Sequence, residues 1–246
     1  MNNDIKLLVS PKNIQEAKVT IEAGVDYIDC KNPDEGSLGA NFPWIIQEIK
    51  NLIPKNSKQQ LSAAIGDFPN LPGTASLAAL GAAASGADII KIGLKGPKTI
   101  KQGINLLQKV TKAVENYNNK IKVVVAGYAD YKRLDNVLDY LSLPEIAAES
   151  GADIVMLDTY IKDNKGLFDF LDSNKLSIFI KKANEYNLGT ALAGNLRKED
   201  IKKLQIISPD IIGIRSAVCE GFDRNNGKIT LNKIIELKNE LIRCSS

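Results

Sequence analysis

The chain of 246 residues contains no histidine. This absence excludes Ser-His-Asp and Cys-His catalysis, and it excludes the common histidine metal sites. Any acid–base chemistry must therefore come from Lys, Asp, Glu, Tyr or Cys side chains.

Cysteine is scarce. Cys30, Cys219 and Cys244 are odd in number, widely spaced and without a Cys-x-x-Cys pair, so neither a disulfide framework nor a zinc site is expected. No apolar run is long enough to span a bilayer, and the first residues do not resemble a signal peptide. We expect a cytoplasmic protein.

Neither sign of charge dominates, because the chain has 32 basic and 29 acidic residues and a net charge of +3. No basic block stands out, so the sequence indicates neither a nucleic-acid nor a membrane partner. The length fits one large α/β domain or two small ones.

Apolar stretches of strand type alternate with stretches of helical periodicity along the whole chain. Eight strands are predicted, at Ile5–Ser10, Tyr27–Lys31, Leu61–Gly66, Ile89–Leu94, Val123–Gly127, Ile154–Thr159, Thr190–Gly194 and Ile211–Ser216. Predicted helices lie between them and after the last. This pattern favours a single (β/α)8 barrel over residues 1–246, and a doubly wound open sheet is the competing fold.

A weak internal repeat sets the register of the even-numbered strands. Gly-x-Asp precedes the second, fourth and sixth strands, ending at Asp26, Asp88 and Asp153, and Pro209-Asp210 precedes the eighth. The residues two and four positions after each Asp are apolar or nearly so, and they should pack under the helices. These positions are Ile28 and Cys30, Ile90 and Ile92, Val155 and Leu157, and Ile212 and Ile214.

The third and fifth positions should point into the barrel, because side chains alternate across a strand. Asp29, Lys91, Met156 and Gly213 would form one interior layer, and Lys31, Gly93, Asp158 and Arg215 the layer above it. The upper layer faces the C-terminal mouth, where barrels of this kind keep their active sites. Two lysines, an arginine and two aspartates are thus predicted to converge there.

Such a set permits nucleophilic lysine chemistry. Burial and neighbouring cations lower the pKa of an amine, so one of Lys31 and Lys91 could attack a carbonyl as a neutral amine and form a Schiff base. The other lysine could transfer protons, and Asp29 could orient Lys31 or shuttle protons. The alternative is that the amines are only salt-bridged, Lys31 to Asp29 and Lys91 to Asp158.

Phosphate binding is predicted where the last two strands end, because loops after strands seven and eight of such barrels often bind phosphate through backbone N–H groups. The loop Gly221–Gly227 adds Arg224, which suits bidentate phosphate contact. The candidates for substrate and phosphate binding are Asp158, Gly194, Asn195, Gly213, Arg215 and Ser216.

Other candidates carry weaker signals. Lys162 follows the sixth strand and could reach substrate, whereas Asp67, Tyr128 and Asp130 end strands and could line the mouth or form caps. Asp34 and Glu35 could in principle hold a metal, but a solvated pair is the simpler reading. Cys30 is expected in the core, and Trp44 is expected as a core anchor.

Several segments together resemble the (5-formylfuran-3-yl)methyl phosphate synthase family over essentially the whole chain. The segments are Leu7–Pro11, Asp29–Pro33, Glu35–Pro43, Lys91–Leu94, Ala126–Asp130, Met156–Thr159 and Asp223–Gly227. The run Gly-Ser-Leu-Gly-Ala-Asn-Phe-Pro is the most specific of them.

The resemblance implies a barrel enzyme that condenses two glyceraldehyde 3-phosphate molecules into a phosphorylated furan aldehyde during methanofuran biosynthesis. It implies a lyase that acts on phosphates, releases phosphate and water, and needs no metal or organic cofactor. It further implies that Lys31 forms the Schiff base, that Lys91 accepts a proton, that Asp29 is the neighbouring acid and that Lys162 is a further functional lysine.

Two rival functions stay open. One is another Schiff-base aldolase acting on sugar phosphates, and the other is a non-catalytic barrel that binds phosphate. A homo-oligomer is also expected, because barrels often associate through helix faces.

Overall fold

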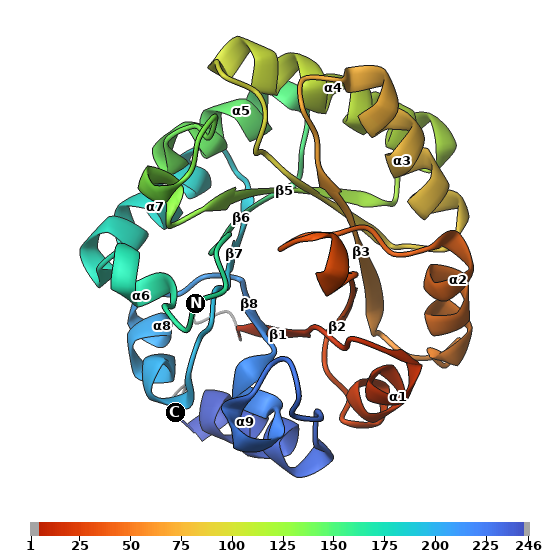
Figure 1. Ribbon diagram of the computed structural model, residues 1–246, viewed down its shortest axis with the longest axis vertical. Helices are drawn as coiled ribbons and strands as arrows, with labels where there is room; N and C mark the ends of the chain where they lie inside the picture. The colour runs from red at the N-terminus through yellow and green to blue at the C-terminus, as the bar shows by residue number, and fades with distance from the viewer. Residues whose placement is uncertain (1–4, 244–246) are drawn as a thin grey trace.

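Eight parallel strands close into a barrel in the computed structural model, which describes residues 5–243 (Figure 1). The strands are β1 (Lys6–Val9), β2 (Tyr27–Cys30), β3 (Gln60–Asp67), β4 (Ile89–Gly93), β5 (Lys122–Tyr128), β6 (Ile154–Asp158), β7 (Gly189–Leu192) and β8 (Ile211–Ile214). Each strand pairs with the next, and β8 pairs with β1. The predicted (β/α)8 barrel is confirmed, and the open sheet is excluded.

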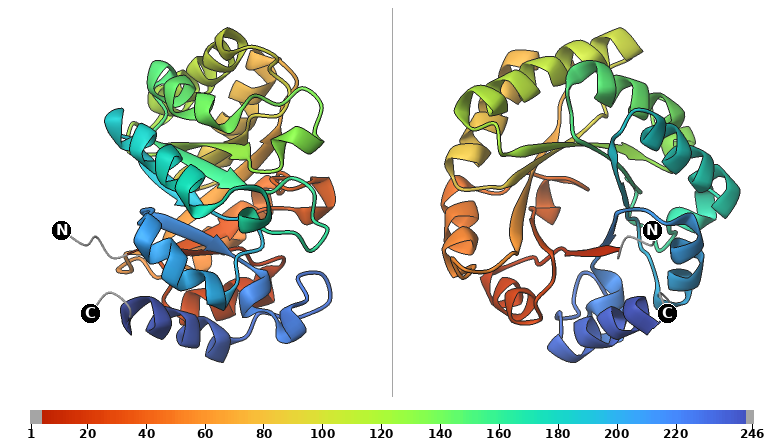
Figure 2. Two further views of the ribbon diagram at one scale, coloured as in Figure 1. Left: turned by 90° about the vertical axis from the view of Figure 1, so that its left-hand side faces the viewer. Right: turned by 180° about the vertical axis from the view of Figure 1, so that it is seen from behind.

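Helices surround the strand ring (Figures 1 and 2). They are α1 (Ile14–Glu22), α2 (Pro43–Leu52), α3 (Pro72–Ala84), α4 (Ile100–Tyr117), α5 (Leu143–Ser150), α6 (Leu167–Phe170), α7 (Ser173–Glu185), α8 (Ile201–Ile207) and α9 (Leu231–Arg243). Side-chain caps begin several of them; for example, Asn13 accepts from the Glu16 N–H at the start of α1. The sequence did not predict α6, because a single turn is too short to show helical periodicity.

The repeated aspartates tie each even strand to the odd strand before it. Their carboxylates accept 2.7–2.8 Å hydrogen bonds from the first free N–H groups of the neighbouring strands. The pairs are Asp26 with Leu7, Asp88 with Leu61, Asp153 with Val123, and Asp210 with Thr190. The repeat therefore has a structural cause. Without the aspartate, the N–H group at the start of the neighbouring strand would need water as its acceptor.

Replacing Asp210 with alanine is expected to lower the free energy of unfolding by about 1–3 kcal/mol, because the buried Thr190 would lose the acceptor for both its N–H and its hydroxyl. Denaturant unfolding measures this loss. The control is Asp135→Ala, which changes an exposed aspartate and should stay within about 0.5 kcal/mol of the parent. Equal stability of the two variants would contradict the explanation.

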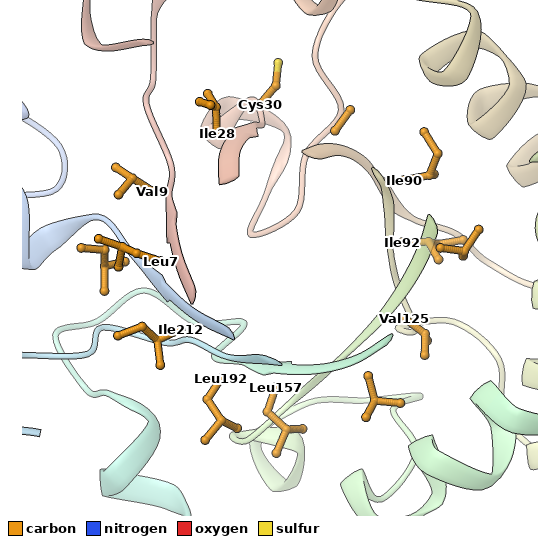
Figure 3. Close-up of a cluster of buried hydrophobic side chains, with 14 of the residues drawn as sticks. Leu7, Val9, Ile28, Cys30, Ile90, Ile92, Val125, Leu157, Leu192 and Ile212 are labelled. Carbon is orange, nitrogen blue, oxygen red and sulfur yellow. The ribbon is translucent and has the colours of Figure 1, made fainter. Parts of the chain in front are cut away.

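The two faces of the strands carry different side chains, in the predicted register. Figure 3 shows apolar side chains such as Ile28, Cys30, Ile92 and Leu157 on the outside of the ring, in the layer between strands and helices. The interior of the barrel has its own apolar cluster, which includes Met156. This register places the charged residues of the even strands inside the barrel.

Two predictions about apolar residues have different outcomes. Cys30 is buried in the core as expected, but the expectation that Trp44 anchors the core is wrong. The Trp44 side chain is 63% exposed and stacks on Phe42 at the start of α2, with ring centroids 4.8 Å apart. An amphipathic helix pattern does not tell whether an aromatic residue at its first turn faces inward.

Candidate active site

A pocket opens at the C-terminal end of the strands, where the loops after β2, β6 and β8 project from the barrel (Figure 2). We call it the inner pocket. Every predicted site residue except Lys91 lines it, namely Asp29, Lys31, Asp158, Lys162, Gly194, Asn195, Gly213, Arg215 and Ser216. The sequence register therefore brings residues from four strands and their loops to one place.

Asp29 on β2 is the centre of the charged network. Its Oδ1 lies 2.6 Å from the Lys91 amine on β4, and its Oδ2 accepts a 2.8 Å hydrogen bond from the Ser10 hydroxyl. The Lys31 amine lies 3.9 Å from Oδ2. Burial raises the pKa of Asp29, but the two lysines outweigh it and hold the pKa below its usual range. Asp29 is therefore an anion shared by two buried amines.

Lys31 is the less constrained of these two amines. It lines the inner pocket, and no hydrogen bond of its amine is found in the described part of the chain. Burial lowers the pKa of Lys31 to about 8, against the opposing effect of Asp29 and Asp158, and Lys91 and Lys162 add to the lowering. A substantial fraction of Lys31 is thus neutral near pH 7–8, as a nucleophilic amine requires.

Lys91 differs from Lys31 in its contacts. It is only 1% exposed, is held by Asp29 and does not line the inner pocket. The alternative pairing of Lys91 with Asp158 does not occur. Asp158 is instead bound to Lys162 at 2.8 Å, and this contact and Lys31 hold the pKa of Asp158 well below its usual range despite its burial.

Lys162 lines the pocket from the loop that follows β6. Burial lowers the pKa of Lys162, although the neighbouring Asp158 opposes the change. The site thus holds two close amine–carboxylate pairs, Lys91–Asp29 and Lys162–Asp158, and the Lys31 amine forms a longer ion pair with Asp29 at 3.9 Å.

Backbone N–H groups form the polar wall of the pocket at the ends of β7 and β8. Across residues 5–243, no acceptor is found for the N–H groups of Gly194, Asn195 and Ser216. Gly194 has φ +106°, and a Cβ there would come within 3.0 Å of the Thr159 nitrogen. A glycine is therefore required at this bend, and the free N–H groups suit an anion such as a phosphate.

The prediction that Arg215 binds phosphate stays a prediction, and the structure gives its guanidinium several protein partners. Its side chain lines the pocket, but the guanidinium binds Glu16 on α1 at 2.7 Å and also donates to the carbonyl oxygens of Ser10 and Arg224. All of these partners belong to the protein. Arg215 therefore fixes the loop after β8 against β1 and α1, whereas the guanidinium of the neighbouring Arg224 has no ion pair among the described residues.

The weaker candidates have structural contacts. Asp67 accepts hydrogen bonds from the Tyr128 hydroxyl and the Lys95 N–H, and Gly93 leaves the room that this contact needs. Asp130 accepts from two N–H groups of the loop after β6. Asp34 and Glu35 are exposed. Within the part of the chain that the structure describes, no group of three or more acidic or cysteine side chains could hold a metal ion.

Sequence reasoning missed Ser10 and Glu16. Ser10 follows β1, so its place at a strand end was a usable signal, and its hydroxyl binds Asp29. Glu16 lies on a helix, where charged residues are usually solvated, and no pattern marked it as buried. Cys30 and Cys219 are buried free thiols, and Cys244 lies outside the described residues.

None of the described helices could cross a membrane, because each is too short or too polar for that. The geometry of fold and pocket defines a (β/α)8-barrel protein whose site is built from buried lysines, paired carboxylates and an anion-binding rim.

Comparison with known proteins narrows this class. The family model described as 4-HFC-P synthase matches residues 7–238. A (5-formylfuran-3-yl)methyl phosphate synthase from Methanococcus aeolicus is 52% identical over 231 residues, covering 94% of this chain and 97% of the relative. One from Methanocaldococcus jannaschii is 50% identical over 232 residues, with the same coverage. The chain belongs to the (5-formylfuran-3-yl)methyl phosphate synthase family, and it is an enzyme.

Solved structures show the same fold at low sequence identity. The 3-hexulose-6-phosphate synthase from Salmonella typhimurium has a TM-score of 0.67 at 16% identity, and it covers 98% of this chain and 100% of that one. KGPDC from Streptococcus mutans has a TM-score of 0.66 at 15% identity, with coverage of 98% and 99%. These likenesses support the barrel alone.

Proposed function

We propose that the enzyme condenses two molecules of glyceraldehyde 3-phosphate into (5-formylfuran-3-yl)methyl phosphate, releasing one inorganic phosphate and water, in methanofuran biosynthesis. The observation that carries this proposal is Lys31, a pocket-lining amine that has no hydrogen bond within residues 5–243 and whose pKa is lowered to about 8. Membership in the family supports the choice of substrates and product.

The Lys31 Nζ attacks the carbonyl carbon of the first triose phosphate, and loss of water gives an imine. The protonated imine withdraws electrons and acidifies the neighbouring C–H group, so that a base can remove its proton and leave an enamine. The enamine carbon then attacks the aldehyde carbon of the second triose phosphate. Ring closure, with loss of inorganic phosphate and a net two molecules of water, gives the aromatic furan, and hydrolysis of the imine frees Lys31.

The two amine–carboxylate pairs are suited to the proton transfers. Lys91 does not line the pocket, whereas Asp29 does, so we assign the proton-accepting role of Lys91 to the Lys91–Asp29 pair acting through Asp29. Lys162 and Asp158 face the same pocket and can exchange protons with leaving groups. The free N–H groups of Gly194, Asn195 and Ser216 would hold the phosphate of the first triose.

The proposal is tested by incubating the protein with glyceraldehyde 3-phosphate alone and following the near-ultraviolet absorption of a furan aldehyde. Borohydride added during turnover should reduce the imine and attach the triose to Lys31, which peptide mass mapping locates. An imine with a non-furan product would identify another sugar-phosphate aldolase. Tight binding without turnover would identify a non-catalytic barrel, and either outcome would overturn the proposal.

The pH dependence of kcat/KM follows from the pKa of Lys31. Only the neutral amine attacks, so kcat/KM should rise with pH through a midpoint near pH 8 and level off above it, because kcat/KM reports groups of the free enzyme. Initial rates from pH 6 to pH 10 measure the curve. A midpoint near 10.5, the ordinary value for lysine, would show that burial does not tune this amine.

The predicted homo-oligomer remains a proposal. Large apolar side chains are exposed on and beside α2 and α3, including Trp44, Leu71 and Leu77, and such a helix face suits association with a second copy. Light scattering in solution measures the mass directly, and a monomer at micromolar concentration would contradict it.

A further inference from the structure

A second cavity lies directly outside the inner pocket, between the loops that follow β6, β7 and β8. We call it the rim cavity. It has a volume of about 410 Å³, against about 30 Å³ for the inner pocket. Lys162, Asn195, Ser216 and Arg224 line both, so the two spaces are continuous.

The rim cavity presents positive charge without matching negative charge. Lys162, Lys165 and Arg224 line it, and its one carboxylate is that of Asp223. That carboxylate accepts three hydrogen bonds within its own turn, from the Asn225 N–H and from the N–H and side-chain amide of Asn226. It is therefore directed at its own loop, and it does not form an ion pair with Arg224.

Arg224 is the unusual member of this set. Across the described residues, its guanidinium has neither an ion pair nor a hydrogen bond, although the side chain is only partly exposed. Its backbone is nevertheless fixed, because the Arg224 carbonyl oxygen accepts a 2.9 Å hydrogen bond from Arg215, and the Asn225 carbonyl oxygen accepts one from Lys12. The Asp158 carboxylate is near enough to raise the pKa of Arg224, against the larger effect of burial, but it does not pair with the guanidinium. A partly buried guanidinium on a fixed backbone, without an ion pair among the described residues, is arranged for an anionic ligand.

The two sides of the cavity are also tied to each other. The Asn195 side-chain amide donates a 2.9 Å hydrogen bond to the Asn164 carbonyl oxygen, which joins the loop after β7 to the loop that carries Lys165. Lys165 itself is exposed. The cations of the rim cavity therefore come from two loops held at fixed positions around one space.

This inference rests on the proposed function, whose reaction brings two phosphate groups to one site. The free N–H groups of the inner pocket account for one phosphate, so the second phosphate needs contacts elsewhere. We propose that the rim cavity binds the phosphate of the second glyceraldehyde 3-phosphate, with Arg224 and Lys165 as its cationic contacts. The second aldehyde would then point inward, toward an enamine on Lys31.

The test separates the two trioses by their readouts. Imine trapping at Lys31 by borohydride needs only the first triose, whereas furan formation needs both. In Arg224→Met, the glyceraldehyde 3-phosphate concentration for half-maximal furan formation should rise about 10- to 100-fold, because a charge-assisted contact to phosphate is lost. The concentration for half-maximal imine trapping should stay within twofold of the parent.

Further variants sharpen this comparison. Arg224→Lys keeps the charge and should recover part of the loss, and Lys165→Met should show a smaller loss of the same kind, because Lys165 is exposed. The matched control is Lys228→Met, an exposed lysine of the same loop that does not line the cavity, and it should behave as the parent. Circular dichroism checks that each variant is folded.

The outcomes are distinct. If Arg224→Met weakens imine trapping and furan formation equally, Arg224 serves the first phosphate and the inference is overturned. If it changes neither, the rim cavity does not bind substrate, and the inference is likewise overturned. If the parent enzyme itself gives no imine and no furan, the proposed function fails, whatever the variants do.

Discussion

Lys31→Arg is expected to abolish borohydride-trapped imine and to lower furan formation about a thousandfold or more, as is typical when a covalent nucleophile is removed. Arginine keeps the positive charge beside Asp29 but stays protonated, so it cannot attack a carbonyl. The fold should be retained, because the Lys31 amine has no hydrogen bond to any described residue and lies 3.9 Å from Asp29. Product assays and peptide mapping measure both effects.

Lys91→Arg is the informative comparison for this variant. Lys91 is held by Asp29 outside the pocket lining, so its replacement should reduce turnover while leaving some trapped triose on Lys31. If the trapped triose were found on Lys91, or if Lys31→Arg kept near-normal activity, the assignment of the nucleophile would be wrong.

Asp29→Asn is expected to lower the free energy of unfolding by about 3–5 kcal/mol, because it removes the anionic partner of the fully buried Lys91 amine. The Ser10 hydroxyl also loses its charged acceptor. Denaturant unfolding at pH 7 measures the loss. Activity should fall as well, since Asp29 lines the pocket.

The double variant Asp29→Asn/Lys91→Met supplies the control. Removing both charges leaves no uncompensated ion, so the double variant should be more stable than the sum of the single losses predicts. Folded Asp29→Asn offers a second readout. Asp29 raises the pKa of Lys31, so its neutralisation should move the midpoint of the kcat/KM profile below pH 8. An unchanged stability together with an unchanged midpoint would contradict the network described here.

The register of the barrel could be predicted because it follows from strand alternation counted from a marked position. The aspartates at the strand entries supplied that mark, and Asp29, Lys31, Lys91 and Asp158 followed from it. Which amine pairs with which carboxylate could not be predicted, because side chains one layer apart can pair in several ways. The salt-bridge alternative paired Lys31 with Asp29 and Lys91 with Asp158. The structure contains the first pair, but it pairs Lys91 with Asp29 and Asp158 with Lys162.

Arg215 shows a second limit. Its inward position was predicted correctly, but its partner Glu16 lies on the first helix, 199 residues away in sequence. No local pattern reveals a contact of that separation. Trp44 shows the same limit for apolar residues. The amphipathic pattern of its helix does not reveal whether another part of the chain packs over the first turn.

The ion pair between Glu16 and Arg215 joins the first helix to the end of the last strand. It therefore stabilises the place where β8 pairs with β1 and closes the ring. During synthesis, Lys31 and Lys91 are added to the chain long before Arg215, so they precede the Glu16–Arg215 ion pair. The burial that lowers the pKa of Lys31 belongs to the closed barrel, and the barrel closes only when β8 pairs with β1. Reactivity toward aldehydes should thus be acquired only when synthesis is nearly complete.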